Sequence, residues 1–270
     1  MSTPHAALDA IERYYDGVPR AAARAERIGP FTLFVRTEPG FPYYARPTLG
    51  EHTFTPSDVA RVRARQRELG VPQSFEWVAE VSPGLRPAIG AAGLAVHTHP
   101  LLVLSPSANR RLDPPPGADV RLVEPEDEKL GQIMAAAGLA FGHPGTASGP
   151  VGLAELAAAS LPAEAAIQAQ RQRLRAGLTV SAVAFIDGQP VASGSHQPLG
   201  RLTEIVGVGT LPAFRRRGLG AAVTARLVED ALRRNLEIVF LSADDDAVAR
   251  VYARLGFERV ATACIAEPPG

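Results

Sequence analysis

The spacing of hydrophobic positions predicts a mixed α/β fold in the C-terminal half of the chain. Apolar residues that alternate with polar ones or form short runs predict strands, and apolar residues three and four apart predict helices. Strands are expected at Asp119–Val123, Leu178–Phe185, Val191–His196, Glu237–Leu241, from Glu204 into a glycine-rich turn, and near the C-terminus. Helices are expected at Glu126–Phe141, Pro162–Ala176, Gly218–Arg234 and Asp245–Leu255. Asp187-Gly188 favours a tight hairpin turn between two of the strands.

The N-terminal half has fewer clear signals, and these also indicate an α/β layer. Thr55-Pro56-Ser57-Asp58 resembles a capping box with proline in the first helical turn, and the helix it begins is expected to end at Gly70. A strand, a short helix and a second strand are expected at Phe75–Val81, Pro83–Ala92 and Leu101–Leu104.

A proline-rich segment predicts the boundary between the two halves. Ser105–Gly117 contains three consecutive prolines among small polar residues, which suit neither a regular helix nor a paired strand. We therefore expect an N-terminal α/β domain at residues 1–110, a linker at 111–118 and a second domain at 119–270.

Composition narrows the functional classes. The 270 residues are 46% hydrophobic, and 28 basic residues balance 28 acidic ones, so neither nucleic acid nor a membrane is an expected partner. Cys264 is the only cysteine, which excludes an internal disulfide and a cysteine-based zinc site. With no signal peptide pattern or long apolar run, a cytoplasmic location is expected. No bound metal is expected.

The turn after the strand at Glu204 is a candidate anion site. Gly218 and Gly220 let a phosphate approach the main chain at a helix N-terminus, and three arginines precede them. The alternative is an ordinary helix start with solvated arginines. A dinucleotide fingerprint is excluded, because Pro212 stands where its third glycine would be.

Three motifs in order resemble the GNAT superfamily of acyl-CoA-dependent N-acyltransferases, over about residues 119–266. They are Val208-Gly209-Thr210-Leu211-Pro212, Arg215-x-x-Gly218-x-Gly220 and Tyr252-Ala-Arg-Leu-Gly256-Phe257. The resemblance implies a mixed, mostly antiparallel sheet flanked by helices. The segment from Phe75 to Leu94 is faintly similar to the last third of such a domain, which would make the chain a tandem protein. Its first copy lacks the anion motif, and we expect no coenzyme site there.

The resemblance also implies roles for individual residues. Main-chain groups of Val208, Gly209 and Thr210 would pair with the pantetheine arm, and one N–H on this strand would stabilise the oxyanion. The pyrophosphate would be held by Arg215, Arg216, Arg217, Gly218, Leu219, Gly220 and Ala221. Glu204 would be the general base, although a surface glutamate on a strand is a comparable interpretation. Tyr252 would be the general acid that protonates the thiolate of coenzyme A.

The expected activity is transfer of an acetyl group from acetyl-CoA to a primary amine on a small molecule. Attack would be direct, because Cys264 has no activating partner in its motif. Two alternatives remain: a non-catalytic acyl-CoA-binding or regulatory module, and a protein or peptide N-acetyltransferase. The acceptor would be selected by the His143–Val151 loop, the helix after it and the first domain. The chain would act as a monomer or homodimer, and His196 is interpreted as structural.

Overall fold

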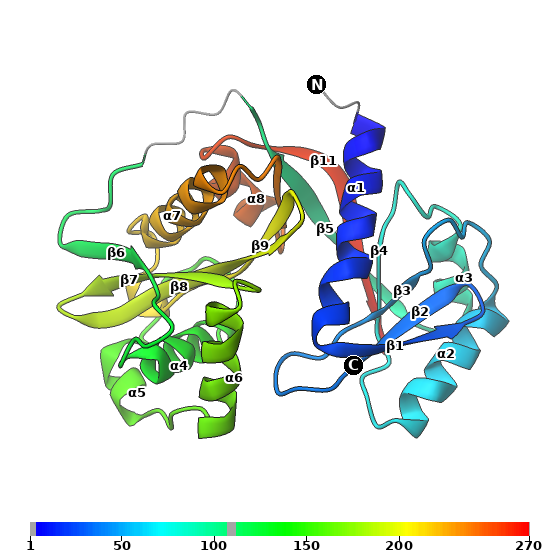
Figure 1. Cartoon of the computed structure of the whole chain (residues 1–270), viewed down its shortest axis with the longest axis horizontal. Helices are drawn as coiled ribbons and strands as arrows, with labels where there is room; N and C mark the ends of the chain where they lie inside the picture. Colours follow the sequence, from blue (N-terminus) through cyan, green and yellow to red (C-terminus); the bar gives the residue numbers. More distant parts are fainter. Residues whose placement is uncertain (1–3, 107–111, 270) are drawn as a thin grey trace. The chain divides into compact units, whose positions relative to one another are not determined.

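The computed structural model describes residues 4–106 and 112–269, which form two compact units (Figure 1). The first unit contains Met1–Leu101, Ser242–Asp245 and Arg259–Gly270, and the second contains Leu102–Leu241 and Asp246–Glu258. The units are therefore not two consecutive stretches of chain, as the predicted boundaries at 110 and 119 would make them. Residues from Arg259 onward group with the N-terminal residues, and part of the expected linker, 107–111, lies outside the described residues.

The first unit is built on a mixed sheet in the order β1-β2-β3-β4-β11. All neighbours are antiparallel except β3 and β4. Its strands are β1 (Ala23–Ile28), β2 (Phe31–Arg36), β3 (Ala45–Pro47), β4 (Phe75–Val78) and β11 (Phe257–Glu267), with β5 (Ala95–Leu104) leading out of the unit. Its helices are α1 (Pro4–Gly17), η1 (Val18–Ala21), α2 (Pro56–Glu68) and α3 (Leu85–Ala91).

An apolar core joins these strands to α2 and α3. Phe31 packs against Phe54 and Phe75 with ring centroids 5.4 Å apart in both pairs. Trp77 on β4 lies opposite Cys264 on β11, and both side chains are buried in the same cluster. Burial raises the pKa of the Cys264 thiol. The only cysteine is thus a small core residue rather than a nucleophile.

The second unit has a sheet in the order β10-β9-β8-β7-β6. The pairs from β6 to β9 are antiparallel, and β9 and β10 are parallel. Its strands are β6 (Ala118–Leu122), β7 (Val180–Ile186), β8 (Gln189–Leu199), β9 (Leu202–Thr210) and β10 (Ile238–Ser242). Its helices are α4 (Leu130–Phe141), α5 (Leu153–Ala158), α6 (Glu164–Arg175), η2 (Pro212–Phe214), α7 (Leu219–Arg233) and α8 (Asp246–Ala253).

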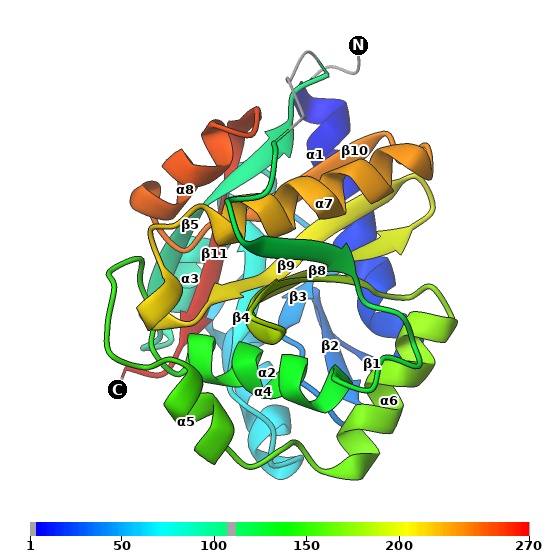
Figure 2. The ribbon, with the colours of Figure 1, turned by 90° about the vertical axis from the view of Figure 1, so that its left-hand side faces the viewer.

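Helices cover both faces of this sheet. Helix α7 lies against β6–β9 on one face, and α4 lies against β8 and β9 on the other (Figures 1 and 2). Nine residues of α7 are buried, including Val223 and Leu227. Gly194 on β8 permits this approach, because a Cβ there would lie 2.9 Å from Val208 and 3.2 Å from Val223. The expected mixed, mostly antiparallel sheet flanked by helices is confirmed.

Several local predictions are confirmed in detail. Thr55 caps α2 because its hydroxyl accepts a hydrogen bond from the N–H of Asp58. In the other direction, the main-chain N–H of Thr55 donates to the Asp58 carboxylate at 3.0 Å. Asp187 and Gly188 have φ values of 49° and 71°, as a primed hairpin turn requires. Helix α4 begins at Leu130 rather than Glu126, because the preceding residues form turns in which Asp127 bonds the N–H of Lys129 at 2.9 Å.

A buried histidine joins the sheet of the second unit to α7. The side chain of His196 is fully buried, with Nδ1 2.9 Å from Thr203 Oγ1 and Nε2 3.1 Å from Asp230 Oδ2. A carboxylate only accepts hydrogen bonds, so Nε2 carries the proton and the Thr203 hydroxyl donates to Nδ1. Burial alone would raise the pKa of Asp230, but hydrogen bonds from Arg234 and His196 outweigh burial and lower it. This network makes His196 structural, as its position in a strand suggested.

We predict that this histidine makes the protein less stable in mild acid. Burial lowers the pKa of His196, and Asp230 only partly offsets the effect. The unfolded chain therefore binds a proton that the folded chain does not, and this stability is lost as pH falls below about 6.5, the ordinary histidine pKa. Urea unfolding at pH 7.5, 6.5 and 5.5 should show a falling free energy of unfolding. His196→Gln should flatten that dependence; an unchanged slope in the variant would contradict the assignment.

Candidate functional site

The segment between β9 and α7 contains two residues with a left-handed backbone conformation. Arg216 has a φ of 64° and Gly218, the N-cap of α7, has a φ of 78°. Both lie in the left-handed region, which only glycine adopts without strain. A non-glycine residue held there commonly marks a functional segment.

Six consecutive main-chain N–H groups in this segment have no acceptor among the described residues. The N–H of Arg215 bonds Pro212 and that of Ala222 bonds Gly218, but those from Arg216 to Ala221 are without a partner. The last of them belong to the first turn of α7, where the helix dipole also contributes positive potential. Such a row of donors is suited to a phosphate or pyrophosphate group.

The glycines of the motif bring this turn close to the end of β9. A Cβ on Gly220 would lie 3.4 Å from Thr210 Oγ1 and 3.8 Å from Val208 Cγ1. Thr210, Val208 and Gly220 are therefore neighbours, as the shared binding role proposed for them requires. On the opposite sheet face, a Cβ on Gly209 would meet Ala140 and the half-exposed ring of Phe141, so the main chain of β9 also approaches α4 closely.

The three arginines of the motif have different environments. Arg216 and Arg217 are exposed, and the Arg217 guanidinium lies 5.3 Å from the ring centroid of Phe214. Arg215 instead donates to carbonyl oxygens: Thr210 at 3.1 Å, Ala147 at 3.1 Å, Ala140 at 3.2 Å, and His143. Its guanidinium is thus directed at the main chain of β9, α4 and the following loop.

The loop after α4 is tied to the anion segment by further main-chain bonds. Gly149 N donates to Pro212 O at 3.2 Å, and Ala213 N donates to Val151 O at 2.9 Å. A Cβ at Gly152 would lie 3.0 Å from that of Ala213, so the loop passes close to η2. The sequence pattern predicted a functional loop at His143–Val151. It did not predict helix α5, nor that Arg215 would hold this loop through hydrogen bonds to its carbonyl groups.

The pairing of β9 with β10 ends early, at Glu204. The last partners in register are Glu204 and Phe240, although β9 continues to Thr210. The six residues after Glu204 therefore lack a β10 partner over about 20 Å of strand. This is the separation of strands that the family resemblance implies. Glu204 lies where the strands separate, and the six free amide groups lie beyond the other end of β9.

Tyr252 lies on α8 and is partly buried. Its ring packs edge-on against Phe257, with centroids 6.0 Å apart. The phenol hydroxyl has no hydrogen-bond partner within the part of the chain that the structure describes. Burial raises the pKa of Tyr252 to about 12, so the phenol is protonated at neutral pH. It can therefore donate a proton to a thiolate without first being charged.

In the described ranges 4–106 and 112–269, no group of three or more His, Cys, Asp and Glu side chains could hold a metal ion. Nor does any described helix combine the length and hydrophobicity that crossing a membrane requires.

Comparison with known proteins identifies the class of this domain. Residues 153–257 match the model of the acetyltransferase (GNAT) family, and they contain the separated strands, the anion segment and Tyr252. This region is an acetyltransferase domain of the GNAT family. No match was found among curated proteins.

Solved structures extend the similarity to the whole chain. A GCN5-related N-acetyltransferase from Kribbella flavida aligns with a TM-score of 0.72 and 25% identity, over 97% of this chain and 96% of that one. A GNAT-family protein from Novosphingobium aromaticivorans aligns at 0.57 and 18% identity over the full length of both. A tandem GNAT protein from the clavulanic acid biosynthesis pathway aligns at 0.55 and 15%, over 89% and 79%. The last two show a shared fold.

We predict that Arg215 stabilises the loop at residues 142–152. Arg215→Met leaves the carbonyl oxygens of Ala140, His143 and Ala147 without their charged donor, which should cost about 2 kcal/mol of stability. Amide hydrogen exchange in the loop should become at least about tenfold faster, in line with that loss. Arg217→Met removes an exposed arginine of the same motif and serves as the control. Equal exchange in the two variants would contradict the anchoring role.

Proposed function

We propose that the second unit is an acetyl-CoA-dependent N-acetyltransferase that acetylates a primary amine on a small molecule. The observation that carries this proposal is the row of six unpaired N–H groups from Arg216 to Ala221, next to a strand whose pairing stops at Glu204. Donors of this kind fit the pyrophosphate of the coenzyme. Val208, Gly209 and Thr210 have no partner in β10, and this edge fits an extended arm with amide groups, which can bind there as an added strand.

The position of Glu204 supports its role as general base. When bound, acetyl-CoA supplies a thioester whose carbonyl carbon an amine can attack. With the pyrophosphate at α7, an arm running along β9 from Thr210 would bring the thioester toward Glu204. The carboxylate would take a proton from the attacking amine, directly or through water, while a main-chain N–H of β9 stabilises the oxyanion.

Tyr252 would complete the transfer. When the tetrahedral intermediate collapses, the C–S bond breaks and the sulfur leaves as a thiolate. The protonated phenol would give its proton to this sulfur, and the phenolate would then recover a proton from solvent. Because the Tyr252 hydroxyl has no partner in the described chain, donation breaks no existing hydrogen bond. An acyl-enzyme is not required, since Cys264 is buried in the first unit.

Arg215 would contribute indirectly, as a positioning residue. Its bonds to α4 and the loop at 142–152 place these segments beside the β9 edge, where the acceptor amine would enter. The exposed Phe141 ring, next to Gly207 and Gly209, would form an apolar part of that wall. Arg216 and Arg217, which face solvent, would add positive charge near the phosphates.

We predict that Gly218→Ala weakens coenzyme A binding by about tenfold or more. Alanine at a φ of 78° is strained by about 1 kcal/mol, and relaxing that strain would turn neighbouring amides away from the phosphates. Gly177→Ala is the matched control, because Gly177 has a φ of 67° and open space around it. Calorimetric titration with coenzyme A should show a loss in the first variant alone. Equal affinities would place the phosphates elsewhere.

We predict that Tyr252→Phe and Glu204→Gln lower turnover differently. Tyr252→Phe should reduce kcat about 100-fold with coenzyme A affinity unchanged, because it removes only a proton donor. Glu204→Gln should reduce kcat because it removes the proposed proton acceptor for the attacking amine. The assay follows release of the free thiol from acetyl-CoA with a panel of small primary amines and lysine peptides. Tight coenzyme binding without turnover on any acceptor would indicate a non-catalytic binding module instead.

A further inference from the structure

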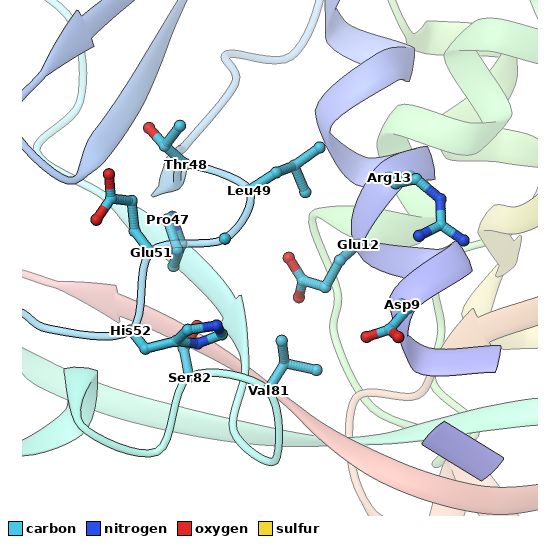
Figure 3. A pocket seen from close by; sticks show the side chains of 11 residues that line it. Asp9, Glu12, Arg13, Pro47, Thr48, Leu49, Glu51, His52, Val81 and Ser82 are labelled. Carbon is cyan, nitrogen blue, oxygen red and sulfur yellow. The ribbon is translucent and has the colours of Figure 1, made fainter. Parts of the chain in front are cut away.

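The first unit contains a pocket of about 260 Å³ between α1 and the loop that follows β3 (Figure 3). One wall is formed by α1, and the other is the turn at residues 47–52. In this turn Glu51 N bonds Thr48 O at 3.0 Å and Gly50 has a φ of 83°. Val81 and the buried Ser82 complete the lining. All these residues belong to one unit, so the pocket is a property of that unit alone.

Glu12 is a buried acidic residue in the lining of this pocket. Its side chain is only 7% exposed, and it points from α1 toward the turn (Figure 3). Oε1 has no hydrogen-bond partner among the described residues. A buried carboxylate oxygen without a donor is unfavourable, and such groups normally have a protein, water or ligand partner. The unpaired oxygen of Glu12 therefore indicates that the pocket accepts a hydrogen-bond donor.

Arg46 is a buried basic group whose charge acts on both Glu12 and Glu76. The buried Arg46 forms an ion pair with Glu76, and its guanidinium lies 3.9 Å from the ring centroid of Tyr15. Burial raises the pKa of Glu12, and although Arg46 and a main-chain hydrogen bond from Val78 act in the opposite direction, the pKa remains raised. A positive group inside the pocket would offset this cost of burial and keep Glu12 ionised.

Acidic side chains outnumber basic ones in the lining. Asp9 and Glu51 are acidic, Arg13 is basic, and His52 is exposed at the rim. Glu51 is paired with Arg27 at 2.6 Å. The pocket is small for a drug-sized ligand, for which about 300–1,000 Å³ is usual. These properties select a compact cation rather than a nucleotide or a peptide.

We propose that this pocket binds a small organic cation, with its primary ammonium group donating to Glu12. Asp9 lies one helical turn away, on the same face of α1. The apolar side chains of Leu49 and Val81 line the pocket and would contact the carbon skeleton. The pocket residues belong to the first unit, whereas the anion segment and Glu204 belong to the second, so the proposal assigns a binding role to the unit that lacks the motif.

Calorimetric titration of the full chain with putrescine, and with 1,4-butanediol as the uncharged analogue, tests this proposal. Putrescine should bind at least tenfold more tightly than the diol. Glu12→Gln should weaken putrescine binding by about 10- to 100-fold, the effect of losing one charged hydrogen bond. Glu68→Gln, which removes an exposed carboxylate of α2 outside the pocket lining, should leave the affinity unchanged.

A second variant keeps the test informative if Glu12→Gln does not fold. Leu49 is 44% exposed at the pocket, so Leu49→Lys should fold normally and place a competing ammonium group there. It should also weaken putrescine binding at least tenfold. Equal affinities for putrescine and the diol, or putrescine binding that neither substitution changes, would overturn the proposal. Coenzyme A binding in the same variants should be unaffected, which separates this site from the acyl-transfer site.

Discussion

The candidate active site depends on one constraint, which is that six successive peptide N–H groups from Arg216 to Ala221 find no acceptor within the described part of the chain. An ordinary helix start leaves about four such donors, and water or a cap satisfies them. Here the left-handed conformations of Arg216 and Gly218 extend the row into the preceding turn. The segment can keep this arrangement because η2 and the first turn of α7 are packed against rigid elements of the sheet and the loop. Its strain is therefore balanced by packing, and the donors are preorganised for an anion.

The strands and the anion segment form one assembly rather than independent features. Thr210 ends β9 and lies next to Gly220. Arg215 donates to the carbonyl oxygens of Thr210 and of Ala140 on α4, and thereby joins β9 to α4 and to the loop after it. A single side chain thereby links the phosphate end of the proposed site to the acceptor side. The first unit contributes something different: a pocket in which an acidic side chain, not an anion cradle, is the distinguishing group. If both proposals hold, the two halves bind groups of opposite charge.

Features set by neighbouring residues could be predicted from the sequence, and features set by distant pairing could not. The capping box at Thr55, the turn at Asp187-Gly188 and the start of α7 are local, and all agree with the structure. The proposed roles of Glu204 and Tyr252 came from the family resemblance and stay predictions. Leu8, Ile11 and Tyr15 recur at helical spacing and are buried on α1, so this helix could have been predicted from the sequence but was missed, as were β1–β3. The motif predicted that Arg215 contacts phosphate. Its hydrogen bonds to carbonyl oxygens could not be predicted, because no sequence pattern shows which carbonyl groups a guanidinium will reach.

The pairing of β11 with β4 has a consequence for how the chain is made. Cys264 lies opposite Trp77, so a strand near the end of the chain completes a sheet that began within the first hundred residues. During synthesis, domains generally fold in the order in which they leave the ribosome. The first unit departs from that order, because one edge of β4 stays open until β11 has been synthesised. Until then the open edge of the apolar strand β4 can pair with other polypeptides, and β11 removes this open edge when it pairs with β4.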